Sequence, residues 1–76
     1  MPLFYFDTKN GTGHLADDQG AQLADENAAH LEAANSLADI VRDAAIGGRL
    51  HPMSISVLDQ DRKPIFRASV EFLKLN

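Results

Sequence analysis

The 76-residue chain contains no cysteine. This excludes a disulfide framework and a thiolate metal site, which often reinforce domains of this size. A domain this short buries a smaller fraction of its surface than a larger one and is marginally stable by itself. Its stability must therefore come from close packing or from self-association. The absence of cysteine also fits a reducing cytosol, and we expect a cytoplasmic protein.

The chain also lacks a long hydrophobic run. No apolar stretch approaches the roughly 20 residues that a membrane-spanning helix needs. The residues Met1–Asp7 have no basic region ahead of their apolar side chains, unlike a signal peptide. We therefore expect no membrane contact and no leader. Hydrophobic residues make up 45% of the chain, which is typical of globular proteins, and the length predicts one domain, residues 1–76.

Positive charge is scarce and unevenly spread. Seven lysines and arginines stand against eleven aspartates and glutamates, which gives a net charge of −4. Lys9 and Arg42 are the only such cations before residue 46, and the others follow it. The overall sign argues against extensive phosphate binding, but the asymmetry leaves room for a small basic patch in the second half of the chain.

No catalytic, cofactor or metal motif can be identified. The spacings of His14, His30 and His51 match no zinc template, and no serine lies in a nucleophile elbow. The acidic residues around Asp7 and Asp17 lack the alternation and the closing glutamate of a calcium loop and are typical of turns. No glycine-rich phosphate loop precedes a helix. We therefore predict no catalytic residue, no cofactor and no metal, and a non-enzymatic protein.

The longest periodic stretch, residues 25–46, predicts one helix. Asp25 is suited to the N-cap position, and Gly47-Gly48 can supply a left-handed residue just beyond the helix. The apolar stripe at helical spacing is mostly alanine: Ala29, Ala33, Leu37, Ile40, Val41 and Ala44. Small side chains allow a helix to lie close to a sheet. We therefore expect this face to be packed, with the phenylalanines of the strands supplying most of the core volume.

Four segments are predicted to form strands. Leu3–Asp7 and Thr12–Ala16 flank Asn10-Gly11, which signals a type I′ hairpin turn. Met53–Leu58 and Ile65–Leu75 flank a second turn, and the latter strand alternates apolar and polar residues clearly. The order β-β-α-β-β makes the class α+β, a small antiparallel sheet of three to four strands with one long helix packed on one face. We expect the strand order 2-1-3-4, with pairing of the first strand to the fourth as the alternative.

Several short motifs resemble a known family. They are the Tyr5-Phe6-Asp7 opening, Asn10-Gly11, Asp17-x-x-Gly20, Leu23-x-Asp25 followed by Ala28-Ala29, and Ile55-x-Val57-x-Asp59-x-Asp61 ending near Lys63-Pro64. Their order and spacing are similar to those of a family of small alphaproteobacterial proteins, abundant in rhizobia, known only as a domain of unknown function. The resemblance covers nearly the whole chain. It implies the same small α+β layout and no established activity.

The resemblance also draws attention to the second hairpin turn. Family members usually carry glycine where this chain has Arg62. If the backbone there is left-handed, a non-glycine residue costs on the order of 1 kcal/mol. Either the turn is reshaped, or Arg62 is kept for a contact. From the sequence alone, Arg62→Gly is expected to raise the melting temperature if the position is left-handed.

The sheet face away from the helix is the main functional prediction. We expect it to carry Leu3, Tyr5, Leu58, Ile65 and Leu73 among Ser54, Ser56, Arg67, Ser69 and Glu71. Mixed surfaces with an aromatic residue are typical of interfaces. We therefore expect a protein that acts by protein–protein interaction and self-associates as a homodimer through this open face or a sheet edge. The predicted interface residues are Leu3, Tyr5, Leu58, Arg67 and Leu73.

Two other functions stay open. A nucleic-acid-associated regulator would contact anionic groups through a basic patch with Tyr5 beside it, formed by Arg62, Lys63, Arg67 and Lys74. A decoy of a basic protein surface would instead use acidic residues: Asp17, Asp18, Asp25, Glu26 and Glu32. The negative net charge favours ordinary solvated side chains over a nucleic-acid interface.

Overall fold

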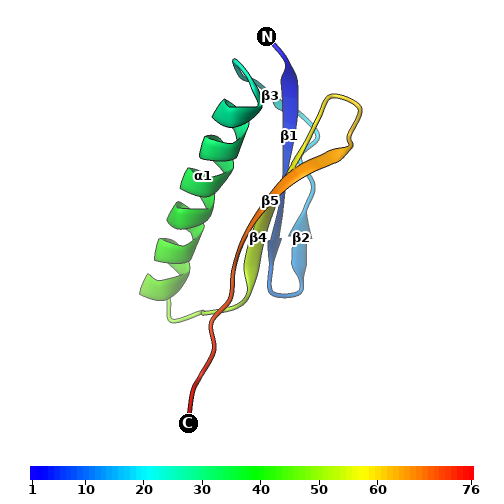
Figure 1. The fold of residues 1–76 in the computed structure, drawn as a ribbon. Helices are drawn as coiled ribbons and strands as arrows, with labels where there is room; N and C mark the ends of the chain where they lie inside the picture. Colours follow the sequence, from blue (N-terminus) through cyan, green and yellow to red (C-terminus); the bar gives the residue numbers. More distant parts are fainter.

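A computed structural model describes all residues, 1–76. One helix, α1 (Glu26–Ile46), packs on a five-stranded antiparallel sheet, so the predicted α+β class is confirmed. The strands are β1 (Leu3–Asn10), β2 (Gly13–Leu15), β3 (Ala21–Gln22), β4 (Met53–Leu58) and β5 (Pro64–Val70). Figure 1 shows α1 along one side of the sheet, with the two ends of the chain at opposite ends of the molecule.

The strand order is β2-β1-β4-β5, and β3 pairs with the beginning of β1. This confirms the predicted order and excludes the alternative, because β1 pairs with β4 over six residue pairs, from Tyr5↔Leu58 to Asn10↔Met53. β3 was not predicted, since two residues are too few to show a pattern. β1 therefore lies between strands that precede the helix, β2 and β3, and β4, which follows it.

The helix begins and ends as its sequence predicts. The Oδ1 atom of Asp25 accepts a hydrogen bond from the N–H of Ala28 at 2.8 Å, which satisfies one of the free donors of the first turn. Gly47 caps the other end, and Gly48 follows with φ +71°, the left-handed residue expected there. Ala29 and Ala33 are completely buried. The alanine stripe therefore lets α1 lie close to the sheet.

The core is small, since only nine of the 76 residues are buried. Eight of them form one cluster between helix and sheet: Phe4, Ala29, Ala33, Leu37, Ala44, Met53, Ile55 and Val57. The alternating residues of β4 are its centre. Phe6, Phe66 and Phe72 pack against the cluster but are only half-buried. The phenylalanines therefore supply less buried volume than expected, and β4 supplies more.

The first hairpin turn differs from the predicted type. β1 continues to Asn10, which pairs with Gly13, so the tip consists of Gly11 and Thr12. Gly11 has φ +61°, whereas neither Asn10 nor Thr12 has a positive φ. A positive φ at the first central position alone is the pattern of a type II′ turn, and the predicted type I′ turn is wrong. The N–H of Gly11 donates to the carbonyl of Pro52 at 2.9 Å.

The last strand ends earlier than predicted. β5 stops at Val70, which pairs with Met53, the first residue of β4. The residue before Met53 is Pro52, which has no N–H to donate. The partner strand ends here, so the alternating pattern of residues 71–76 has nothing to pair with, and this segment extends away from the sheet (Figure 1).

Three predicted positions on the sheet are therefore wrong. Leu73 and Lys74 lie in the extended segment, and the side chain of Leu73 is 71% exposed. Ile65 lies at a β-bulge, where the register shifts between Val57 and Leu58. It packs against the core cluster and does not face outward. The bulge reverses the side to which the alternation had assigned Ile65.

Candidate functional site

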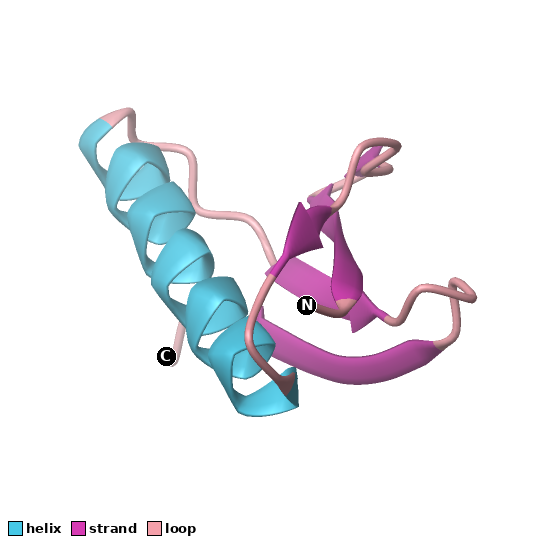
Figure 2. Ribbon diagram, turned by 90° about the horizontal axis from the view of Figure 1, so that it is seen from above, coloured by secondary structure: helices cyan, strands magenta, loops and turns pink.

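The sheet face away from α1 is the candidate site. Across β1, β4 and β5 its side chains stand in three rows: Tyr5–Leu58–Pro64, Asp7–Ser56–Arg67 and Lys9–Ser54–Ser69. The face is hollowed, with a volume of about 810 Å³, and most of the side chains that line it are polar. Figure 2, a view from above, shows β5 curving around this part of the sheet. The outer face is therefore a polar trough with one apolar end.

The predicted interface residues separate into two groups. Tyr5, Leu58 and Arg67 share the outer face, as expected. Leu3 lies beside Gly20: a methyl group built on Gly20 would come within 3.0 Å of the Leu3 Cδ1 atom and 3.1 Å of the Tyr5 Cε1 atom. The chain itself therefore partly covers the apolar end of the trough, and the open area is more polar than predicted.

Lys9 and Asp7 also belong to this face. Lys9 was not predicted on it because β1 was expected to end at Asp7, and Asp7 itself was not named among the residues of the face. The signal was present in the sequence. Phe4, Phe6 and Thr8 alternate with Tyr5, Asp7 and Lys9 through the end of the strand, and this period of two continues to the turn.

The carboxylate of Asp17 joins the loop between β2 and β3 to the edge of β1. Its Oδ2 atom accepts from the N–H of Phe6 at 3.1 Å, and its Oδ1 atom accepts from the N–H groups of Gln19 and Gly20 at 3.0 and 3.1 Å. The N–H of Asp17 donates to Asp7 Oδ1 at 3.0 Å. β3 pairs with the start of β1 and β2 with its end, so Asp17 takes the place of a strand partner for Phe6 between them.

These contacts change the acidity of Asp17. Burial by itself raises the pKa of the carboxyl group, but the three backbone N–H donors and the positive charge of Arg62 lower it by more. The pKa of Asp17 therefore lies below its ordinary value of 3.8. Hydrogen bonds that favour the charged form have this effect. The loop is held by an ionised Asp17.

Arg62 connects the β4–β5 turn to the same loop. It has φ +63° and is the only non-glycine residue with a positive φ. Its guanidinium carbon lies 4.0 Å from the centroid of the Tyr5 ring, and its Nη1 atom donates to the carbonyl of Asp17 at 3.2 Å. The left-handed backbone considered from the sequence is present, and Arg62 also makes contacts. The Asp17–Tyr5–Arg62 cluster, as we call these three residues, was not predicted.

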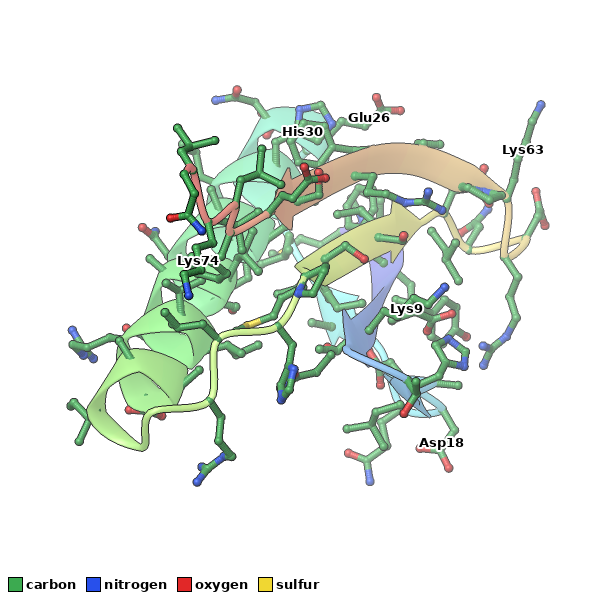
Figure 3. All side chains as sticks on the ribbon, turned by 90° about the horizontal axis from the view of Figure 1, so that it is seen from below. Lys9, Asp18, Glu26, His30, Lys63 and Lys74 are labelled. Atoms are coloured by element: carbon green, nitrogen blue, oxygen red, sulfur yellow. The ribbon has the colours of Figure 1, made fainter.

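The four basic residues proposed to contact anionic groups do not form one patch. Arg62 lies on Tyr5, and the Nε atom of Arg67 donates to Ser56 Oγ at 2.9 Å. Lys63 projects from the β4–β5 turn, and Lys74 lies in the extended segment on the opposite side of the molecule (Figure 3). A nucleic-acid strand would need a continuous basic track, which these positions do not provide.

Two of the five acidic residues considered for a decoy surface have roles inside the fold. The carboxylate of Asp17 accepts three backbone hydrogen bonds, and that of Asp25 caps the helix. Asp18, Glu26 and Glu32 are exposed. The acidic surface is therefore smaller than the sequence indicates.

The three histidines lie in different surroundings. The ring of His30 stacks on Phe66, with centroids 4.1 Å apart, and its Nε2 atom is buried without a hydrogen-bond partner. His14 lines the outer hollow, and His51 is exposed beside Gly11. No three histidine, aspartate or glutamate side chains gather as a metal site requires. α1, the single helix, is not apolar enough to cross a bilayer.

Comparison with known proteins gives one match. Residues 3–71 match the family described as "Domain of unknown function (DUF6894)". No curated protein and no solved structure matches the chain. The match covers the helix and all five strands and ends one residue beyond β5, so the chain belongs to the DUF6894 family of domains of unknown function.

Proposed function

We propose that this chain is a non-enzymatic protein that acts by protein–protein interaction, and that it forms a homodimer by pairing the free edge of β5 with β5 of a second copy. The observation that carries the proposal is the unequal pair of sheet edges. At one edge β2 has three residues, whereas at the other β5 has seven and pairs only with β4. An unpaired strand of this length offers a row of backbone donors and acceptors to another strand.

The side chains of β5 do little to protect that edge. Pro64 lacks an N–H, but it stands at the first position of the strand. Arg67 is the one charged residue within β5, and its Nε atom is held over the sheet by Ser56 of the neighbouring strand. Edge strands that avoid pairing usually carry charges, bulges or prolines along their length. In β5 the proline and the bulge lie at the first two residues, Pro64 and Ile65, and the last three residues, 68–70, carry none of these features.

The small core supports self-association. Phe66, Ala68 and Val70 pack on the core cluster from β5 and remain half-buried. A second copy paired with β5 would cover more of these side chains. Each further square ångström of apolar surface removed from water contributes about 25 cal/mol, which is important to a domain without disulfides or metals.

The charge pattern distinguishes two neighbouring registers. A two-fold axis at Ala68 places Arg67 opposite Ser69 of the second copy and Phe66 opposite Val70. An axis at Arg67 would instead place two guanidinium groups opposite each other, and directly opposed like charges destabilise a strand pair. We therefore expect the axis at Ala68.

The side-chain contacts support a non-enzymatic role. Hydrogen bonds between side chains join Ser36 to Glu32, Arg42 to Asp39, and Arg67 to Ser56. None joins a serine to a histidine or a histidine to a carboxylate, as nucleophilic catalysis requires. The carboxylate of Asp7 in the hollow already accepts from the N–H of Asp17.

The register can be tested by changing the charge at Ser69, which is exposed. Ser69→Glu would place a carboxylate opposite Arg67 of the second copy, and Ser69→Arg would place a guanidinium there. Two such pairs form in each dimer at about 0.2–1 kcal/mol each, so the dissociation constant should fall or rise by about two- to thirtyfold. Sedimentation equilibrium over a concentration series measures this constant.

The control is the same pair of changes at Ser54, in the same row but on β4, away from the edge. These variants should associate like the unmodified chain. If both the unmodified chain and its Ser69→Glu variant stay monomeric at the highest concentration, the homodimer is contradicted. Equal dissociation constants for the two Ser69 variants would contradict the register.

A further inference from the structure

Two cations in the outer hollow have no counter-ion. The chain contains one ion pair, between Arg42 Nη2 and Asp39 Oδ1 at 3.0 Å on the helix. Lys9 makes no hydrogen bond through its side chain, and Arg67 uses only its Nε atom. Both side chains are exposed and line the same hollow. Their remaining N–H donors are available to a ligand.

The acidic residues of the hollow do not neutralise these cations. Asp7 lies in the same row as Arg67 but on the far strand, and one of its oxygens is occupied by the N–H of Asp17. Glu71 lies beyond the end of β5. Neither forms an ion pair with Lys9 or with Arg67. An anionic group that entered the hollow would therefore meet free positive charge.

The geometry suits a small ligand. Lys9 on β1 and Arg67 on β5 stand on either side of β4 and one row apart, and strands lie about 4.8 Å apart, so β1 and β5 are about 10 Å apart across the sheet. Figure 3 shows Lys9 projecting on the side of the sheet away from the helix. Between the two cations lie Ser54 and Ser56, and the hydroxyls of Ser54 and Ser69 have no hydrogen-bond partner.

We infer that the outer hollow binds a small oxyanion, a carboxylate or phosphate group, between Lys9 and Arg67. The terminal N–H groups of Arg67 form a planar fork that fits two oxygens of such a group. The ammonium of Lys9 supplies a second charge from the opposite strand, and the free hydroxyls of Ser54 and Ser69 donate to the remaining oxygens. This site does not depend on the dimer proposed above.

The test is a titration followed by the backbone amide signals in two-dimensional NMR spectra. Sodium phosphate and sodium acetate are added in separate arms at constant ionic strength, with sodium chloride as the reference. We expect saturable shifts of the Ser54, Ser56 and Ser69 amides with at least one oxyanion. The two arms distinguish a tetrahedral phosphate from a planar carboxylate as the preferred group.

Variants locate the site. Lys9→Ala and Arg67→Gln should each weaken binding about tenfold, the effect of losing one charged hydrogen bond. Lys63→Ala and Lys74→Ala remove cations outside the hollow and should bind like the unmodified chain. The amide spectrum of each variant also shows whether it is folded. The Lys9 side chain makes no contact that its removal would lose, so Lys9→Ala can be titrated even if Arg67→Gln unfolds. Shifts that grow linearly like those with chloride, or a dissociation constant in Lys9→Ala equal to that of the unmodified chain, would overturn the inference.

Discussion

Arg62→Gly is expected to lower the stability of the domain by up to about 1.5 kcal/mol, although it relieves a strained backbone. At φ +63° a non-glycine residue is disfavoured by about 1 kcal/mol relative to glycine. The side chain offsets this cost. Its stacking on Tyr5 contributes about 0.5–1 kcal/mol at an exposed site. Its hydrogen bond to the Asp17 carbonyl contributes about 0.5–1.5 kcal/mol.

The contacts therefore reverse the expectation from the sequence alone, in which Arg62→Gly raises the melting temperature. Arg62→Ala removes both contacts and keeps the backbone strain, so it should lower stability by about 1–2.5 kcal/mol. The expected order of stability is the unmodified chain, then Arg62→Gly, then Arg62→Ala. A loss of 1 kcal/mol corresponds to about 4–8 °C in melting temperature for a domain of this size. Thermal and urea unfolding followed by far-UV circular dichroism measure both values.

Lys63 provides the matched control in the same turn. Its φ is not positive, and its side chain makes no hydrogen bond or ion pair. Lys63→Gly should therefore be less stable than Lys63→Ala, the reverse of the order at Arg62. An Arg62→Gly variant more stable than the unmodified chain would refute the value assigned to the contacts. Equal stability of Arg62→Gly and Arg62→Ala would refute the backbone strain.

Three further predictions concern Asp17, Gly20 in the same loop, and His30 with its buried Nε2 atom. Asp17 has a folded pKa below 3.8, while an unfolded aspartate titrates near 3.9, so its stabilisation is present above that value and is lost as the pH falls through the folded pKa. The urea midpoint should therefore decrease as the pH is lowered through this range, and the decrease should be smaller in Asp17→Asn. Gly20→Ala should cost more than about 1–2 kcal/mol, because φ is +77° and the new methyl group meets the Phe4 carbonyl oxygen at 3.1 Å. His30→Phe should raise stability by about 1 kcal/mol, because it removes a buried unpaired nitrogen and keeps an aromatic ring on Phe66; thermal unfolding measures both changes.

Each of these predictions has a matched control. Asp18→Asn changes an exposed neighbour of Asp17 and should keep the full pH dependence. Gly48→Ala meets a left-handed backbone at φ +71° but no atom within 4 Å, so it should cost less than Gly20→Ala. His14→Phe alters an exposed histidine and should bring no gain. The Asp17 argument fails if Asp17→Asn leaves the pH dependence of the urea midpoint unchanged. The Gly20 argument fails if Gly20→Ala and Gly48→Ala are equally stable. The His30 argument fails if His30→Phe is less stable than the unmodified chain.

Local patterns predicted the elements that depend on near neighbours in the chain. The helix, its Asp25 cap and the bounds of β4 follow from capping chemistry and from apolar periodicity, and all agree with the structure. The strand order also agrees, with β1 and β4 paired in the middle of the sheet.

The differences arise where a distant segment decides the outcome. β5 stops early because Pro52 ends its partner, and Ile65 turns inward at a bulge. The role of Asp17 depends on where β1 lies beside its loop, and that of Arg62 on where Tyr5 lies across the sheet. Side-chain contacts of this kind have no spacing in the sequence that signals them. The candidate site was therefore predicted in part, through Tyr5, Leu58 and Arg67. Of the two cations in the hollow, Arg67 was predicted on this face and Lys9 was not.

The central position of β1 has a consequence for how the chain folds. Each residue pair between β1 and β4 joins segments on opposite sides of the 21-residue helix, so the sheet cannot form until this long loop closes. The β1–β2 hairpin and the helix can form locally and quickly, but neither buries an apolar face until β4 arrives. We therefore expect folding to be limited by that single meeting of strands. Substitutions in β4 should slow folding, and those in the Asp17–Tyr5–Arg62 cluster should mainly speed unfolding.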